Sequence, residues 1–157
     1  MLKIVDVSKE GDDLDHIRSL FREYEKELNE DLCFQSFEAE LANPLKKYGI
    51  PTGALLLAWW DDELAGCIAM AAGPGVLTCE MKRLYVQPAY RNYGIGRALA
   101  DKLLNIAIES NYRFMKLDTF IRLEQAVKLY ESLGFTPISA YYVNPLPGVL
   151  YMEKSLR

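Results

Sequence analysis

The chain has 157 residues, 50% of them hydrophobic and 25% charged, and carries a formal net charge of −4 at pH 7. A chain of this length and composition predicts one globular domain over residues 1–157, and its acidic balance disfavours a nucleic-acid surface. Three cysteines without a C-x-x-C spacing and a single histidine disfavour a metal site and favour a cytoplasmic protein with reduced thiols.

Strand and helix patterns alternate in the N-terminal half. After a first short strand, apolar residues from Leu14 to Leu28 recur at helical spacing behind a capping Asp12 or Asp13. The longest unbroken apolar run, residues 54–60, is too short to span a bilayer and predicts a strand, and no signal segment is expected. The elements predicted here are a strand at 2–5, helices at 12–28 and 34–41, a loop at 44–53, and strands at 54–60, 64–72 and 76–86.

The C-terminal half adds two helices and three strands. Gly134 is expected just after the second of these helices, where glycine tolerates the left-handed conformation. The order is a meander of strands, then strand–helix–strand–helix, then a closing hairpin, which predicts an α+β domain. The predicted elements are helices at 95–109 and 123–133 and strands at 114–117, 135–143 and 149–152.

The most informative segment runs from Leu84 to Leu99, where a strand leads into a helix through two glycines. Pro88 ends the strand because it cannot donate to a sheet, and Gly94 and Gly96 let a ligand approach the backbone closely. The free N–H groups at the helix start predict a site for the phosphates of a nucleotide-like cofactor. The third glycine of a dinucleotide fingerprint is missing, since Leu99 stands there, and an ordinary strand–turn–helix corner is the alternative.

Two motifs resemble those of the GCN5-related N-acetyltransferases, the GNAT superfamily. Arg91-x-x-Gly94-x-Gly96 resembles the acetyl-CoA loop of the family, and residues 126–135 (AVKLYESLGF) resemble its A-x-x-L-Y-x-x-x-G-F segment, in the family's order and spacing. The resemblance implies an α+β fold in α/β/α layers. Its mixed, mostly antiparallel sheet has about seven strands with about four helices and a V-shaped splay between strands 4 and 5. Residues 81–86 (MKRLYV) also resemble a bacterial group of small members with unassigned substrates.

The resemblance implies acetyl-CoA as co-substrate and no metal. The pyrophosphate is expected on the backbone N–H groups after Arg91, and Arg91 and Arg97 add positive charge there unless they are solvated surface side chains. The pantetheine amides are expected to pair with the preceding strand, where a backbone N–H at Leu84 or Tyr85 stabilises the oxyanion. The cofactor-binding residues implied are Leu84, Tyr85, Val86, Arg91, Asn92, Tyr93, Gly94, Ile95, Gly96 and Arg97.

One position departs from the family's pattern. Many members carry an asparagine, which bonds the pantetheine, where this chain has Leu123. Asp118-Thr119, at the end of the preceding strand, or Gln125 are the candidates to replace it.

The resemblance also implies a catalytic pair. A lysine-like amine, with a pKa of about 10.4, is protonated at neutral pH, so a base must take its proton. Several family members place a glutamate at the position of Glu80, which implies Glu80 as the base; the alternative is a structural ion pair with Lys82 or Arg83. Tyr130 matches the family tyrosine that points at the sulfur of coenzyme A, which implies a general acid; the alternative is a core aromatic residue.

The predicted function is acetyl-CoA-dependent N-acetyl transfer, in which an amine attacks the thioester directly in a ternary complex. A non-catalytic acyl-CoA sensor or interaction module, and an O-acetyltransferase or a user of longer acyl donors, are alternatives. The expected partner is a small-molecule or peptide amine, not nucleic acid or membrane, and the protein is expected as a monomer or homodimer. The acceptor pocket is expected between the first two helices, the loop at 44–51 and the closing hairpin around Tyr141, Tyr142 and Asn144, where Tyr48, Trp59, Trp60 and Tyr142 either line it or pack in the core.

Overall fold

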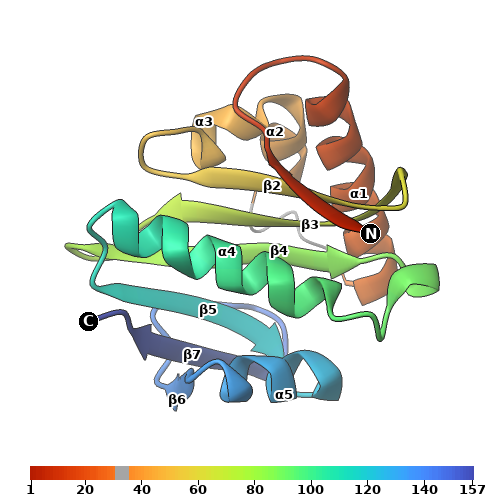
Figure 1. The fold of residues 1–157 in the computed structure, drawn as a ribbon. Helices are drawn as coiled ribbons and strands as arrows, with labels where there is room; N and C mark the ends of the chain where they lie inside the picture. Colours follow the sequence, from red (N-terminus) through yellow and green to blue (C-terminus); the bar gives the residue numbers. More distant parts are fainter. Residues whose placement is uncertain (31–35) are drawn as a thin grey trace.

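In the computed structural model, which describes residues 1–30 and 36–157, seven strands form one sheet in the order β1-β2-β3-β4-β5-β7-β6 (Figure 1). Of the neighbouring pairs, β4 and β5 run parallel and the others antiparallel. The predicted mixed, mostly antiparallel sheet is therefore confirmed. The strands are β1 (Leu2–Asp6), β2 (Ala54–Trp60), β3 (Glu63–Ala72), β4 (Thr78–Val86), β5 (Phe114–Phe120), β6 (Thr136–Ile138) and β7 (Val149–Ser155).

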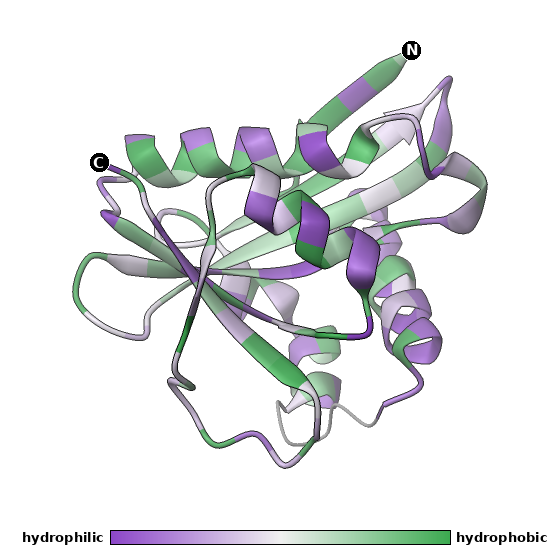
Figure 2. Cartoon of the chain, turned by 90° about the horizontal axis from the view of Figure 1, so that it is seen from below, coloured by the Kyte–Doolittle hydropathy of each residue, from purple (hydrophilic) through white to green (hydrophobic). Residues whose placement is uncertain are grey.

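Helices cover both faces of the sheet and give α/β/α layers. Helices α1, α2 and α3 pack on one face, and α4 and α5 pack on the other (Figure 1). Hydrophilic and hydrophobic bands alternate along the helices in Figure 2, as expected when one side of each helix contacts a sheet. Within the described ranges, no helix is both long and apolar enough to cross a membrane. The helices are α1 (Asp12–Leu28), α2 (Phe37–Ala42), α3 (Pro44–Tyr48), α4 (Ile95–Glu109) and α5 (Glu124–Ser132), with a one-turn 3₁₀ helix, η2 (Pro88–Tyr90).

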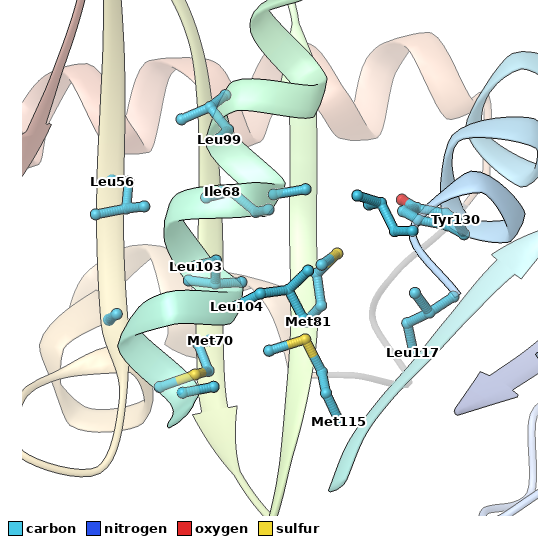
Figure 3. Packing of buried hydrophobic residues seen from close by; sticks show 14 of the residues in the cluster. Leu56, Ile68, Met70, Met81, Leu99, Leu103, Leu104, Met115, Leu117 and Tyr130 are labelled. Carbon is cyan, nitrogen blue, oxygen red and sulfur yellow. The ribbon is translucent and has the colours of Figure 1, made fainter. Parts of the chain in front are cut away.

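The central strands are buried on both faces, so the core has two parts. Leu56 and Ala58 of β2 belong to the cluster under α4 and α5, whereas Leu55 and Leu57 belong to the cluster under α1, α2 and α3. Because successive strand residues point to opposite faces, a strand covered on both sides requires an unbroken apolar run. Figure 3 shows the first cluster, with Leu103 of α4 among residues of the sheet.

Two segments before β2 differ from the predicted elements. The expected loop at 44–53 begins with the helix α3, because Pro44 stands at the first helical positions, where its fixed backbone angle suits a helix start. This adds a helix to the four that were expected. The helix expected at 34–41 is observed from Phe37 as α2, and residues 34 and 35 lie outside the described part of the chain.

The strands after α4 also differ in length from the prediction. Strand β5 continues to Phe120 rather than ending at Leu117, because β7 pairs with it along its whole length. The strand expected at 135–143 is restricted to Thr136–Ile138, since the chain then leaves the sheet. We call residues 139–148 the closing loop; within it, Tyr141 contacts β4 instead of extending β6.

Strand β4 changes its pairing halfway along, and this opens the sheet. On the β3 side, a β-bulge gives β4 one extra residue between Lys82 and Tyr85, and Arg83 within it has a left-handed φ of 59°. On the β5 side, pairing covers three residue pairs and ends at Glu80. A bulge increases the local twist of its strand, so the two parallel strands diverge beyond these residues. The V-shaped splay predicted between strands 4 and 5 is confirmed.

Candidate active site

The splay between β4 and β5 holds a cleft lined from both faces of the sheet. Ala126 and Tyr130 line it together with the cluster under α4 and α5, whereas Tyr24 and Leu123 line it together with the cluster under α1, α2 and α3. Asn144 of the closing loop also lines it. The walls of the cleft therefore come from both faces of the sheet. The other lining residues are Leu28, Met81, Lys82, Arg83, Leu84, Asp118, Thr119, Phe120 and Val149.

Arg83, the residue in the bulge, is held by a buried ion pair. Its guanidinium donates to both carboxylate oxygens of Glu40 on α2, at 2.8 and 3.0 Å, and lies over the rings of Tyr24 and Phe37. Burial alone would raise the pKa of Glu40, but Arg83 keeps it below its usual range. The alternative in which Arg83 pairs with Glu80 is therefore wrong, because Arg83 has its partner on α2.

Glu80 lies at the closed end of the splay, in the last residue pair that joins β4 to β5. Tyr141 donates a hydrogen bond to its Oε2 at 2.7 Å, and the Lys82 Nζ is 3.9 Å from its Oε1. Burial and the Glu80 carboxylate both raise the pKa of Tyr141, so the phenol stays protonated as the donor. The ion pair with Lys82 that was the structural alternative is present, and it leaves Glu80 next to the cleft.

Lys82 lines the cleft two residues further along β4. Its side chain is only 6% exposed, and burial lowers its pKa, which the Glu80 carboxylate partly opposes. Within residues 1–30 and 36–157, the ammonium has no hydrogen-bond acceptor, because the Glu80 oxygen at 3.9 Å is at ion-pair distance only. Lys82 therefore brings an incompletely paired cation into the cleft.

Asp118 lines the cleft from β5. The Tyr142 hydroxyl donates a short hydrogen bond to it, and the Asn144 amide donates to the Tyr142 oxygen at 3.0 Å. Asp118 and Thr119, two of the candidates to replace the family's asparagine, both line the cleft, whereas Gln125 is exposed on α5. Asp118 is thus a carboxylate within the cleft itself, which Glu80 is not.

Tyr130 lines the cleft from the other face, on α5. Its ring packs edge-on against Phe135 and is 7% exposed. In Figure 3, its hydroxyl points from α5 towards β4. Burial raises the pKa of the phenol, so the hydroxyl is protonated at neutral pH and can donate a hydrogen bond. The ring is therefore part of the core, as expected for a core aromatic residue. The hydroxyl points towards β4, as a role for Tyr130 as general acid requires, and that role stays a prediction.

The glycine loop, residues 91–97, leads from η2 into α4. Gly94 precedes the helix with a φ of 77°, and the N–H of Ala98 donates to its carbonyl at 3.1 Å. The N–H groups of residues 95–97 come before this bond and have no intrahelical acceptor. A Cβ on Gly96 would come no closer than 3.7 Å to a neighbouring element, and one on Gly94 would meet nothing within 4 Å. The loop thus offers backbone donors, with open space beside Gly94 and ordinary van der Waals contact at Gly96.

The two arginines of the glycine loop have partners within the protein. Arg91 donates to the Val86 carbonyl at 2.9 Å and to both carboxylate oxygens of Glu27 at 2.6 and 2.7 Å. Arg97 donates to the Ser132 hydroxyl at 2.8 Å. Both guanidinium groups place positive charge beside the loop. Their contact with phosphates stays a prediction.

The strand before the loop has a free edge along the splay. Leu84, Tyr85 and Val86 follow Glu80, where pairing with β5 ends, so their backbone groups on that side have no partner strand. An extended ligand can use such an edge as a further strand would.

The aromatic residues considered for an acceptor pocket separate into different environments. Tyr48 is fully buried in the cluster under α1, and Trp59 packs edge-on against His16. Trp60 stacks on Tyr93 of the glycine loop, with ring centroids 5.1 Å apart. Tyr142 is the member of this set that belongs to the polar network of the cleft.

The described thiols are buried. Burial raises the pKa of Cys79 to about 12 and also raises that of Cys67, so both are protonated at neutral pH. Cys33 lies outside the described residues. In the ranges 1–30 and 36–157, no group of three or more His, Cys, Asp or Glu side chains is arranged to hold a metal ion.

Several contacts of the site join residues far apart in the chain, so no sequence motif predicts them. Glu40 and Arg83 are 43 residues apart in the chain, and Tyr141 and Glu80 are 61 apart. The sequence signal that was available is the run of three charged residues, Glu80, Lys82 and Arg83, in a strand that must be buried. Buried charges need partners, so this run predicts that other elements supply them, although not which residues.

Sequence comparisons agree with this geometry. A model of the acetyltransferase (GNAT) family matches residues 14–135. An uncharacterised N-acetyltransferase of Schizosaccharomyces pombe is 43% identical over 142 residues, which are 90% of this chain and 87% of that protein. Human N-acetylaspartate synthetase is 33% identical over 115 residues, which are 73% of this chain but only 38% of the human protein.

Solved structures show the same fold. An acetyltransferase of the GNAT family from Staphylococcus aureus superposes with a TM-score of 0.81 over 100% of both chains, at 21% identity. The PaiA N-acetyltransferase from Thermoplasma acidophilum, solved in complex with coenzyme A, has a TM-score of 0.72 over 99% of each chain, at 19% identity. The family match includes the splay, the glycine loop and Tyr130. This chain therefore belongs to the acetyltransferase (GNAT) family and is an acyltransferase.

Proposed function

We propose that this chain transfers the acetyl group of acetyl-CoA to an amine by direct attack in a ternary complex. The observation that supports this most is the cleft lined from both faces of the sheet, with Tyr130 on one side and Lys82 and Asp118 on the other. The amine nitrogen bonds to the thioester carbonyl carbon, the C–S bond breaks, and a base takes one amine proton. Coenzyme A leaves as the thiolate and is protonated afterwards.

The residues present fit acetyl-CoA. The free N–H groups of residues 95–97 and the positive end of the α4 dipole suit a pyrophosphate, and the open space beside Gly94 leaves room for it. The unpaired edge of β4 at residues 84–86 suits the two amides of the pantetheine arm. A backbone N–H at Leu84 or Tyr85 is the donor that we propose stabilises the oxyanion.

Two carboxylates compete for the role of base. Glu80 accepts a hydrogen bond from Tyr141 and does not itself line the cleft, so we propose proton transfer through a water molecule. Asp118 is the second candidate, because it lines the cleft itself. We assign the role to Glu80, since one of its oxygens has no hydrogen-bond donor within 3.5 Å among the described residues and can accept a proton.

Tyr130 assists the leaving group. A thiol of pKa about 8.5 is a stronger acid than a tyrosine, and burial raises the pKa of Tyr130 further. Complete proton transfer to the thiolate is therefore unfavourable. Tyr130 acts by donating a hydrogen bond to the sulfur as negative charge develops there, and the thiolate takes its proton later.

The state of the thiols supports direct attack. An acetyl-cysteine intermediate needs a thiolate nucleophile, and burial keeps both Cys67 and Cys79 protonated at neutral pH. Acetyl-CoA alone should therefore leave these two thiols unmodified.

The acceptor is a small-molecule amine. The name of the human relative, N-acetylaspartate synthetase, states an acetylated amino acid as its product, which supports a small acceptor here rather than a peptide. A non-catalytic acyl-CoA sensor on the same fold is the competing function, and it requires neither Glu80 nor Tyr130.

A thiol-release assay with acetyl-CoA and a panel of amines tests the proposal. The panel contains amino acids, polyamines, an aminoglycoside and a lysine peptide. We expect saturable thiol release with at least one amine, matched by one acetylated product per thiol, and no acetylated protein by mass spectrometry. Acetyl-CoA binding without turnover on any amine would instead favour the sensor.

A further inference from the structure

Lys82 is the polar group of the cleft whose contacts are least complete. An ammonium has three N–H donors, and that of Lys82 has no acceptor within hydrogen-bond distance among the described residues, although its side chain is 6% exposed. Burying a cation without hydrogen-bonded partners is costly. The Glu80 carboxylate at 3.9 Å offsets part of this cost, but its other oxygen is engaged by Tyr141.

The neighbouring residue Arg83 shows that the cations of β4 are not all left without a hydrogen-bonded carboxylate. Arg83 is as deeply buried, and the protein supplies Glu40 to it in a bidentate arrangement. Lys82 has no such dedicated carboxylate, and it lines the cleft where the acceptor enters. The Lys82 ammonium, which is not among the fully buried polar atoms without a partner, is thus open at the cleft to water or to an anionic group of a ligand.

We propose that Lys82 binds a free carboxylate of the acceptor, and that the acceptor class is the α-amino acids. This inference rests on the proposed function. The base Glu80 and the Lys82 ammonium are 3.9 Å apart, so even with one water molecule between Glu80 and the amine, one small molecule can carry both the amine and the anion. An α-amino acid has both groups on one carbon. A polyamine or a lysine side chain within a protein has no carboxylate there.

Asp118 completes the charge pattern. It lines the cleft from β5, across the splay from Lys82. A zwitterion can place its ammonium towards the carboxylates of Glu80 and Asp118 and its carboxylate towards Lys82. Two anionic groups and one cation thus match the amine and the carboxylate of the same small molecule.

The test uses matched acceptors that differ in one group. Each L-α-amino acid of a panel is paired with its primary carboxamide, which keeps the amine and the side chain but has no carboxylate. For the wild type, we expect kcat/KM to be about 10- to 100-fold higher with the acid than with the amide, the range of a charge-assisted hydrogen bond. Lys82→Met should remove this preference by raising KM for the acid, and Lys82→Arg should restore part of it.

Two outcomes would overturn the assignment. One is a wild type that uses acid and amide equally, and the other is a Lys82→Met variant that loses both equally, as expected if Lys82 only orients Glu80. Calorimetric titration of the same pairs into protein saturated with coenzyme A gives the same comparison without turnover, so a failure of catalysis is separable from a failure of carboxylate binding. A thermal melt checks that Lys82→Met is folded, since this variant leaves the Glu80 carboxylate without its cation, and Lys82→Arg is the variant that keeps the charge.

Discussion

Lys82 and Arg83 are adjacent cations in one buried strand, and they differ in how completely other residues pair with them. Arg83 has both carboxylate oxygens of Glu40 at hydrogen-bond distance, on a different element of the fold. Lys82 has a single ion-pair contact at 3.9 Å and borders the cleft. The Arg83–Glu40 pair is complete in itself, whereas the Glu80–Lys82 pair leaves donors and acceptors for a ligand.

The difference indicates a division of roles along β4. The complete pair holds the bulge residue Arg83 in a left-handed conformation that non-glycine residues seldom adopt. The bulge accompanies the opening of the sheet, so the pair acts on the shape of the cleft. The Glu80–Lys82 pair lies beside the cleft, and in our proposal its charges act on the substrate. Mutations in the two pairs should therefore affect different measurements.

The largest effect is expected for Glu80→Gln, which keeps the shape of the side chain but removes the proton acceptor. The turnover number should fall about 10²- to 10⁴-fold, the usual range for a general base. The loss should become smaller as pH rises, because more of the amine is then already deprotonated. A pH–rate series with one amine measures this, and Kd for acetyl-CoA should change little.

Asp118→Asn is the matched variant for that experiment. If it shows the larger loss and Glu80→Gln keeps wild-type turnover and the same pH profile, then Asp118 is the base. Glu80 would in that case be a structural partner of Lys82 and Tyr141.

Glu40→Ala should act on stability instead. Removing one partner of a buried ion pair leaves Arg83 uncompensated, which costs about 3–5 kcal/mol of the free energy of unfolding. Urea denaturation measures this loss, and Glu38→Ala, an exposed position on the same helix, is the control. A loss below about 1 kcal/mol would show that the bulge does not depend on the pair.

Gly96→Val should weaken cofactor binding without unfolding the protein. A Cβ at Gly96 would be in ordinary van der Waals contact with Leu129 and Val86, and the valine methyl groups would extend from there beside the free N–H groups. We expect Kd for acetyl-CoA to rise about 10- to 100-fold, the value of lost charge-assisted hydrogen bonds. Calorimetry gives Kd and a thermal melt checks the fold. Gly96 is a cleaner position than Gly94, whose φ of 77° makes any side chain strained. Unchanged affinity would remove the phosphate site from the glycine loop.

Tyr130→Phe should have a smaller effect, about tenfold in turnover, because it removes one hydrogen bond to a departing thiolate. The loss should be least with a thioester whose thiol has a lower pKa than that of coenzyme A, since that thiolate departs unaided. Steady-state rates with acetyl-CoA and with such a thioester measure how the loss depends on the pKa of the leaving thiol. An equal loss with both donors would indicate that Tyr130 only packs in the core.

The smallest effect is expected for Arg91→Ala. The guanidinium is exposed and already paired with Glu27, so its contribution to phosphate binding is screened. We expect KM for acetyl-CoA to rise only a few-fold, with about 1 kcal/mol as the upper limit. A rise that persists at high salt would show that Arg91 contacts a phosphate directly.

The fold could be predicted largely from local patterns. Apolar periodicity located α1 and α4, and the uninterrupted run at 54–60 marked a strand covered on both faces. The closing loop was not predictable in this way, because Tyr141 and Tyr142 leave the sheet to bond carboxylates on β4 and β5. Those contacts join distant parts of the chain, and no local preference encodes them.

The candidate site was predictable to a similar degree. The glycine loop follows from two residues without side chains next to a helix start, which is a local property. Resemblance implied Glu80 and Tyr130, and the structure puts Tyr130 in the cleft and Glu80 beside it. The partner of Arg83 and the open contacts of Lys82 depend on three-dimensional packing, so the sequence offered them only as charges that need partners.

The stacking of Trp60 on Tyr93 has an optical consequence. The chain has two tryptophans, and this one lies against the glycine loop, with ring centroids 5.1 Å apart, while Trp59 packs against His16. In a Trp59→Phe protein, the indole emission would come from Trp60 alone. If acetyl-CoA binds at the loop as proposed, each arrival and departure would change the fluorescence of the protein, and cofactor exchange could be followed in real time without any label.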